Sequence, residues 1–211
     1  MSLAYWRVEP IWRGETVAIL GNGPSLIRED VDACRGRVRV IAVNDALSLA
    51  SWADLHYFCD LRWWRLRRGE PWYRAFRGIR ATLENPDARA EEPAIRGVRF
   101  GGTFGICDEP DAICTGGNSG YACVNLAAHL GASSVLLLGF DLRPVEGRSH
   151  WHGGYPWPAE ADHYARMMSA FRTLARALSD PPRSPVVLNC TPGSVLRDFP
   201  ETALSEALRR P

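Results

Sequence analysis

The stretch AILGNGPSL, residues 18–26, decides the fold class, because an apolar run stops abruptly in glycine, proline and small polar residues. Residues 16–20 predict a buried strand, and residues 26–34 predict a short helix with Ser25 as its N-cap. Two glycines remove Cβ atoms from this turn, and the amides at a helix N-terminus attract anions. The turn is therefore either purely structural or a place where a phosphate approaches the backbone.

Strand patterns and helix patterns alternate along the rest of the chain. Further strands are predicted within residues 37–45, 53–60, 135–138 and 185–190. This alternation predicts an α/β fold in one domain, residues 1–211, with a mainly parallel sheet between two layers of helices. Flexible or lid-like segments are predicted near residues 62–112, which are rich in Arg and Trp, and near residues 143–160, with a flexible region around residues 84–97.

The composition excludes several kinds of site. All 25 basic residues are arginine, so the chain offers no lysine for a P-loop, a Schiff base or a general base. The formal net charge of +1 gives no bulk attraction to nucleic acid, and no nucleic acid polymer is expected as a partner. No apolar run approaches the roughly 18 residues that span a membrane. Scattered cysteines and the lack of a signal peptide predict reduced thiols in the cytoplasm, and association into homo-oligomers is left open.

A second glycine-rich turn, GGNSG at residues 116–120, also leads into a predicted helix. Ligands of parallel α/β sheets bind beyond the carboxyl ends of the strands, and five predicted strands end in small, polar or acidic residues. Strand-end capping of the next helix is the structural alternative for the polar ones. The nucleotide-binding residues predicted from these turns and ends are Gly21, Asn22, Gly23, Pro24, Ser25, Asn44, Asp45, Asp60, Gly117, Asn118, Ser119, Gly120, Thr191 and Ser194.

The loop after residue 142 carries side chains suited to acid–base chemistry. In an extended chain His150 and His152 lie on one side, and imidazole can accept a proton near neutral pH. Two histidines alone are a weak zinc motif, and solvated loop histidines are the structural alternative. At the strand ends, Asp60 and Asp141 can orient a substrate hydroxyl or bind Mg²⁺ together.

AILGNGPSL, AVND at residues 42–45 and GGNSGYACVNLAAHLGASSVLLLGFDL at residues 116–142 together resemble bacterial CMP-sialic acid-dependent sialyltransferases. They are also similar to flagellin-glycosylation proteins, to archaeal-type 6-hydroxymethyl-dihydropterin diphosphokinases and to short phage-encoded relatives. The similarity covers about residues 16–60 and 114–155. It implies a Rossmann-like three-layer sandwich with a nucleotide site.

The resemblance also implies roles for individual residues. In the sialyltransferases the first turn contacts the nucleotide phosphate and ribose, an Asn after the second strand joins the site, and the Ser-Gly turn lies near the cytidine. A loop histidine acts there as the base, and tyrosines assist departure of the phosphate. The positions that match are Asn22, Gly23, Pro24, Ser25, Asn44, Asn118, Ser119 and Gly120, with His150 or His152 and Tyr155 as catalytic candidates beside Asp141.

Three functions follow from these observations. The one we expect is a glycosyltransferase-like enzyme that uses a CMP-sugar type donor, a His base and a small-molecule or glycan acceptor, with no metal required. The second is a diphosphokinase acting on a small hydroxymethyl heterocycle; it needs Mg²⁺, for which Asp45, Asp60 and Asp141 would be the ligands. The third is a non-catalytic nucleotide-binding phage accessory protein.

Overall fold

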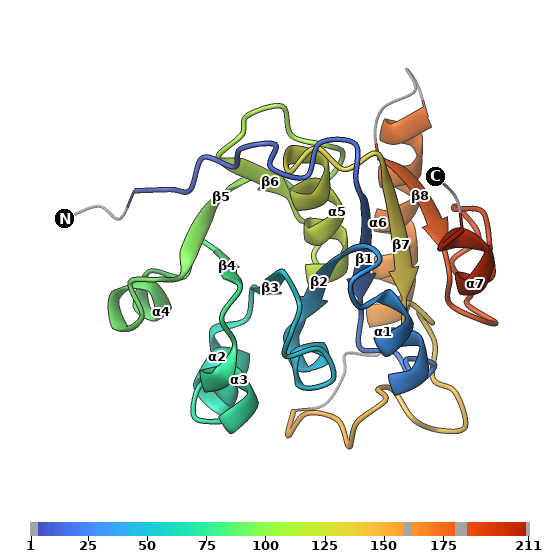
Figure 1. Cartoon of the computed structure of the whole chain (residues 1–211), viewed down its shortest axis with the longest axis horizontal. Helices are drawn as coiled ribbons and strands as arrows, with labels where there is room; N and C mark the ends of the chain where they lie inside the picture. The colour runs from blue at the N-terminus through green and yellow to red at the C-terminus, as the bar shows by residue number, and fades with distance from the viewer. Residues whose placement is uncertain (1–3, 158–161, 180–184, 210–211) are drawn as a thin grey trace.

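The computed structural model describes residues 4–157, 162–179 and 185–209. Eight strands form one sheet in the order β6-β5-β4-β3-β2-β1-β7-β8, and every strand pairing is parallel (Figure 1). The strands are β1 Thr16–Leu20, β2 Arg39–Val43, β3 Leu55–Phe58, β4 Ile79–Leu83, β5 Arg96–Gly102, β6 Ala112–Cys114, β7 Ser134–Leu138 and β8 Val186–Asn189.

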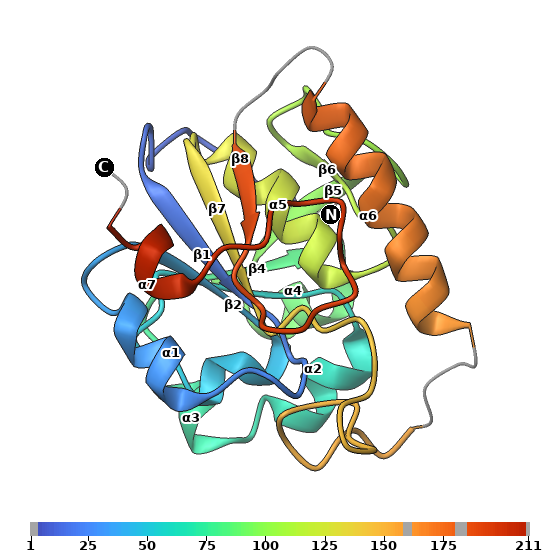
Figure 2. The ribbon, with the colours of Figure 1, turned by 90° about the vertical axis from the view of Figure 1, so that its right-hand side faces the viewer.

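Helices cover both faces of this sheet, as Figure 2 shows. They are α1 Arg28–Cys34, the 3₁₀ helix η1 Asn44–Ser48, α2 Leu61–Arg67, α3 Pro71–Ala75, α4 Pro86–Glu91, α5 Ser119–His129, α6 His163–Ser179 and α7 Leu204–Ala207. Residues of α5 and α6 pack in one apolar cluster, and residues of the other helices pack in a second cluster on the opposite face. The predicted α/β, Rossmann-like sandwich is confirmed. Among the described residues, no helix is long and apolar enough to cross a membrane.

Side-chain alternation explains how β1 divides the core. Val17 and Ile19 belong to the cluster under α5 and α6, whereas Ala18 and Leu20 belong to the cluster under α1. Successive side chains of a strand point to opposite faces of the sheet, so a continuous apolar run is the pattern of a strand buried on both sides. β1 is therefore a central strand, paired with β2 on one side and with β7 on the other.

Residues 62–112, for which flexible or lid-like segments are predicted, overlap three helices and three strands of the fold. β4 and β5 lie within the sheet, and Trp63, Trp64 and Tyr73 are buried in the core. Residues 84–97, predicted to be flexible, contain α4 and the first residues of β5. The sequence of β5, RGVRFGG, lacks regular alternation, and so its pattern was too weak to predict a strand.

The predicted start of the first helix is also corrected. α1 begins at Arg28, and its N-cap residue Ile27 makes no side-chain capping bond. Ser25 does not cap this helix, because its Oγ donates instead to Asp141 Oδ2, at 2.9 Å. The serine thus ties the turn after β1 to the turn after β7.

Candidate functional site

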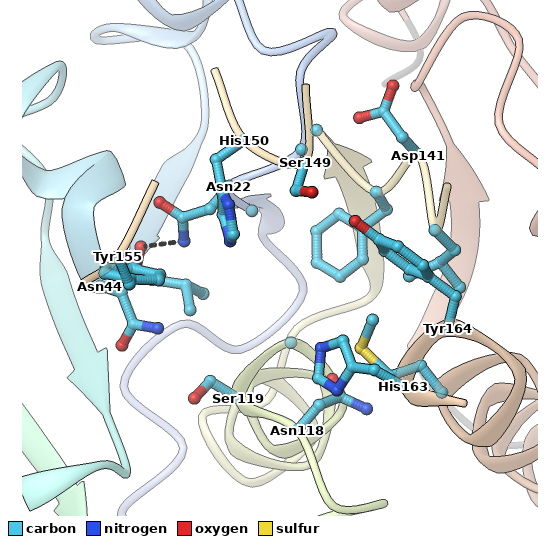
Figure 3. Close-up of a pocket in the computed structure, with 18 of the residues that line it drawn as sticks. Asn22, Asn44, Asn118, Ser119, Asp141, Ser149, His150, Tyr155, His163 and Tyr164 are labelled. Carbon is cyan, nitrogen blue, oxygen red and sulfur yellow. Dashed lines mark hydrogen bonds between the residues drawn. The ribbon is translucent and has the colours of Figure 1, made fainter. Parts of the chain in front are cut away.

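A cavity of about 490 Å³ lies at the carboxyl ends of β1, β2, β3 and β7 (Figure 3). The strand order reverses between β1 and β7, and open α/β sheets bind their ligands at such a reversal. The predicted site residues all line this cavity, with five exceptions: Ser25, Asp45, His152, Thr191 and Ser194. Segments far apart in the sequence therefore meet around one space of the size that small-molecule sites have.

Contact with the turn after β7 explains the glycines of the first turn. Gly21 N donates to Leu138 O and Gly23 N donates to Gly139 O, both at 2.8 Å. A Cβ atom at either glycine would lie 2.6 Å from Gly139 O. These two amides are bonded to protein acceptors, as the structural alternative for this turn predicts, and the missing Cβ atoms make room for protein backbone.

Asn22 stands between those glycines and lines the cavity. Its Nδ2 donates to Val43 O at 2.8 Å, which fixes the carboxamide, and its Oδ1 is buried without a hydrogen-bond partner in the described structure. Leaving a buried acceptor unpaired costs about 1–3 kcal/mol. Such an atom is well placed to accept from a hydroxyl or amino group of a ligand.

The second turn differs from the first because it leaves amides unused. Asn118 Oδ1 accepts from Tyr121 N at 2.8 Å and so caps α5. The amides of Ser119 and Gly120, the first two residues of this 11-residue helix, have no partner among the described hydrogen bonds. Gly117 has φ +71°, and a Cβ atom there would meet nothing within 4 Å. The N-terminus of α5 thus opens into the cavity with two donors for an anion.

Asn44 lines the cavity from the end of β2 in a strained conformation. Its φ of +49° lies in the left-handed region, where non-glycine residues are uncommon and which is often found at functional sites. Its carbonyl oxygen lies 3.3 Å from Nε2 of His56, a fully buried side chain whose pKa is lowered by burial to about 3. The neutral imidazole can donate to that carbonyl. Asn44 Oδ1 is buried and, within the described residues, has no partner.

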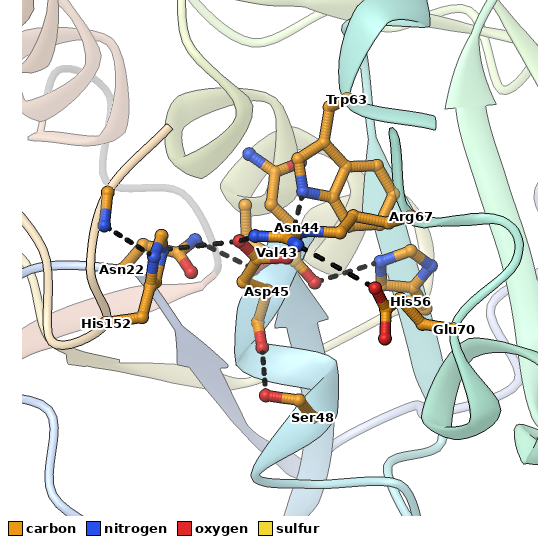
Figure 4. Close-up of polar contacts among 11 residues, drawn as sticks. Asn22, Val43, Asn44, Asp45, Ser48, His56, Trp63, Arg67, Glu70 and His152 are labelled. Carbon is orange, nitrogen blue, oxygen red and sulfur yellow. Dashed lines mark hydrogen bonds and ion pairs between the residues drawn. The ribbon is translucent and has the colours of Figure 1, made fainter. Parts of the chain in front are cut away.

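Asp45 is a buried anchor beside the cavity and does not line it (Figure 4). Its Oδ1 accepts from Trp63 Nε1 at 3.2 Å and from Arg67 Nε at 2.9 Å, and its Oδ2 accepts from Arg67 Nη2 at 3.1 Å. His152 Nε2 lies 3.3 Å from the same Oδ2. One carboxylate therefore joins η1, α2 and the loop after β7, which is a structural role that differs from the predicted contact with a ribose or a metal.

The three aspartates proposed for Mg²⁺ do not form a metal site. Asp60 caps α2 by accepting from Arg62 N at 2.7 Å, as the structural alternative predicted. Asp141 is 2% exposed and accepts from the Ser25 hydroxyl. Within residues 4–157, 162–179 and 185–209, no group of three His, Cys, Asp or Glu side chains is placed to hold a metal ion. The ligand set predicted for the diphosphokinase is therefore not assembled.

Thr191 and Ser194 shape the turn after β8 and do not line the cavity. Both are buried. Thr191 Oγ1 donates to Leu137 O and accepts from Phe140 N, and Ser194 Oγ donates to Phe140 O. These bonds satisfy backbone groups of the turn after β7. Their predicted contact with a nucleotide has no geometric support.

The loop after β7 supplies one wall of the cavity through Ser149, His150, Tyr155 and Trp157. The Tyr155 and Trp157 rings are stacked, with centroids 5.1 Å apart, and the buried Tyr155 hydroxyl lies beside the side chains of Asp45 and Asn44. Burial, together with His152, lowers the pKa of His150 to about 4, so its imidazole is neutral at pH 7. Residues 158–160 of the predicted lid-like segment lie outside the described residues.

Several lining residues were missed by the sequence reasoning. His163, Tyr164 and Met167 come from the first turns of α6, where no motif marks them. Leu142 has φ +51°, an uncommon conformation for a bulky residue, and is 8% exposed at the cavity wall. Arg143 follows it and also lines the cavity. The one sequence feature that could have indicated this part of the site is a histidine, His163, at the start of an amphipathic helix.

A scan against protein-family models and searches of curated proteins and of solved structures find no match to this chain. The geometry of the cavity therefore carries the functional argument.

Proposed function

We propose that this protein is a nucleotide-dependent transferase of the glycosyltransferase type. The observation that supports this most is the pair of buried, unpartnered acceptor atoms at one cavity in the described structure: Asn22 Oδ1 and Asn44 Oδ1. They lie at the reversal of the strand order, in the same cavity as the N-terminus of α5. A ligand that carries both hydroxyl or amino donors and a negative charge fits this combination.

In this proposal the phosphate of the donor lies at the second turn. The amides of Ser119 and Gly120 donate to it, and the positive end of the α5 dipole adds to the attraction. The two asparagine oxygens accept from donors on the ribose or the base. Phe140, Leu142 and Met167 line the α6 side of the cavity with apolar side chains. The proposal places the transferred group or its acceptor on that side.

His150 is the base in this proposal. Its ring lines the cavity and is neutral at pH 7, so a nitrogen lone pair is free to accept a proton from an acceptor hydroxyl, while the lowered pKa makes it a weaker base than a free imidazole. His152 does not line the cavity; its Nδ1 accepts from Gly154 N at 3.1 Å, and its Nε2 faces Asp45. His152 instead positions the loop, and the stacked imidazoles of the pair lie with their centroids 5.0 Å apart.

The first experiment is a thermal-shift panel of nucleoside monophosphates and sugar nucleotides, with and without Mg²⁺. A ligand at about 100 times its dissociation constant adds about 2.7 kcal/mol to the free energy of unfolding. We expect CMP or a CMP-sugar to give this shift without Mg²⁺. A panel without any shift would contradict nucleotide binding.

The second experiment separates the two histidines by donor hydrolysis and transfer. His150→Gln is expected to bind the nucleotide as the wild type does and to lose turnover by about 10²–10⁴-fold, the usual contribution of a general base. His152→Gln serves as the matched control, with the smaller loss of a positioning residue. Equal turnover in the wild type and His150→Gln would contradict the assignment. Nucleotide binding without turnover in any variant would favour the non-catalytic module.

A further inference from the structure

Two cysteines at the β5–β6 edge of the sheet lie in contact. Cys107 Sγ and Cys114 Sγ are 2.8 Å apart, and both thiols are free. Cys107 and Cys114 are 7% and 5% exposed and Cys190 is 6% exposed, whereas Cys34 and Cys123 are completely buried and Cys59 is partly exposed. Neither Cys107 nor Cys114 lines the cavity, so this pair is separate from the proposed transferase site.

The backbone around the two thiols is held in place by Asn125, a fully buried residue of α5. Its Oδ1 accepts from Cys107 N at 3.1 Å and from Cys114 N at 3.2 Å, and its Nδ2 donates to Gly105 O at 3.1 Å. Gly101 leaves space for the Cys107 sulfur, which a Cβ atom at that position would strike. The fold therefore holds the two sulfur atoms so close together that a small movement allows a disulfide bond to form.

We infer that Cys107 and Cys114 are a redox modification site: a dithiol that a small-molecule disulfide oxidises to an intramolecular disulfide. One thiolate attacks a sulfur of the small disulfide, releases one small thiol and forms a mixed disulfide. The second cysteine then attacks the protein sulfur of that mixed disulfide and releases the other small thiol. In total the two cysteines lose two protons and two electrons, one S–S bond forms, and the small disulfide is reduced to two thiols.

The bond joins the segment after β5 to the end of β6. Thr115, which follows Cys114, donates its amide to Gly102 O at 3.2 Å and leads into the second turn. Closing this short loop restricts the unfolded chain and stabilises the edge from which that turn projects. Burial raises the pKa of Cys107 to about 12, so the exchange is slow at neutral pH.

The test treats the folded protein with glutathione disulfide at pH 8.5 for several hours, then counts thiols after denaturation. We expect the six thiols of the reduced chain to fall to four, and the thermal midpoint to rise by roughly a few degrees. Asp108 and Asp111 lie between the two cysteines. A protease that cleaves before aspartate therefore separates them unless they are joined, and the linked peptides identify the bond.

Single variants control the assignment. Cys123→Ser removes a cysteine outside the pair and is expected to go from five thiols to three. Cys107→Ser and Cys114→Ser are expected to yield no linked peptide, with wild-type circular dichroism as the check on folding. Six thiols after treatment of the wild type, or a bond that joins another pair, would overturn the inference.

Discussion

Two glycine-rich turns of similar sequence frame the cavity, and they are built differently. In the first turn the amides of Gly21 and Gly23 are bonded to the backbone at the end of β7 and just after it, and the turn leads into the seven-residue α1 without a side-chain cap. In the second turn Asn118 caps the longer α5, and two amides of its first turn have no partner among the residues that the structure describes. Glycines before a helix thus mark a close approach of backbone, whether the approaching group is a ligand or the protein itself.

The largest expected difference between the turns concerns stability. Gly23→Ala places a Cβ atom against Gly139 O and the Asp141 carboxylate and should lower the free energy of unfolding by about 3 kcal/mol, the upper part of the range for overpacking. Gly117→Ala meets no atom and pays only for the left-handed backbone, about 1 kcal/mol. Urea denaturation measures both. Equal losses of unfolding free energy in the two variants would contradict the claim that only the first turn is packed closely against protein.

A smaller difference is expected between the polar side chains of the two turns. Ser25→Ala removes the hydroxyl that donates to the buried Asp141 carboxylate and should cost about 2 kcal/mol. Asn118→Ala removes a helix cap and should cost about 1 kcal/mol. Thermal denaturation at pH 7 ranks the two. A larger loss for Asn118→Ala would mean that the polar side chain of the second turn, and not that of the first, contributes more to stability.

The smallest effect near neutral pH comes from two histidines with lowered pKa values. His56 and His150 have pKa values lowered to about 3 and about 4, below the value of about 6.5 in an unfolded chain. The unfolded state therefore binds more protons between these values, and stability should fall as the pH drops from about 6.5 towards 4. Unfolding followed across pH 7 to 4 checks the sign.

A single variant tests which of the two histidines causes most of this pH dependence. The stability of His150→Gln should still fall by most of the wild-type amount as the pH drops, because His56 is the more deeply buried of the two and retains its lowered pKa. Stability that stays constant from pH 6.5 to 4 in the wild type would contradict the neutral state of both imidazoles.

The centre of the fold and the strand ends could be predicted from the sequence because their patterns are local. The predicted strand at residues 16–20 coincides with β1, and Asn22 and Asn44 were found because parallel strands end at one edge. β5 and α4 were missed because they lack clear periodicity, and β4 gave only a weak strand pattern.

The part of the site that was missed depends on tertiary contacts. Whether a glycine serves a ligand or a neighbouring carbonyl depends on what packs against it, as Gly23 and Gly139 show. His163 lines the cavity because α6 begins beside the other lining residues, among which Figure 3 shows the His163 side chain. Neither relation leaves a pattern in the sequence around the residue.

The most direct test of the account is a calorimetric titration of CMP and cytidine into three proteins: wild type, Ser119→Ala and Ser119→Pro. Proline is tolerated at the first position of a helix, and the extended backbone of Asn118 suits a following proline, so Ser119→Pro removes one amide donor and should leave α5 folded. Ser119→Ala removes the hydroxyl and keeps the amide.

We predict that the wild type binds CMP more tightly than cytidine and that Ser119→Ala keeps this preference. Ser119→Pro should bind CMP about tenfold more weakly, the loss of one charge-assisted hydrogen bond, with its affinity for cytidine unchanged. Equal binding of CMP by all three proteins would contradict the placement of the phosphate at the second turn.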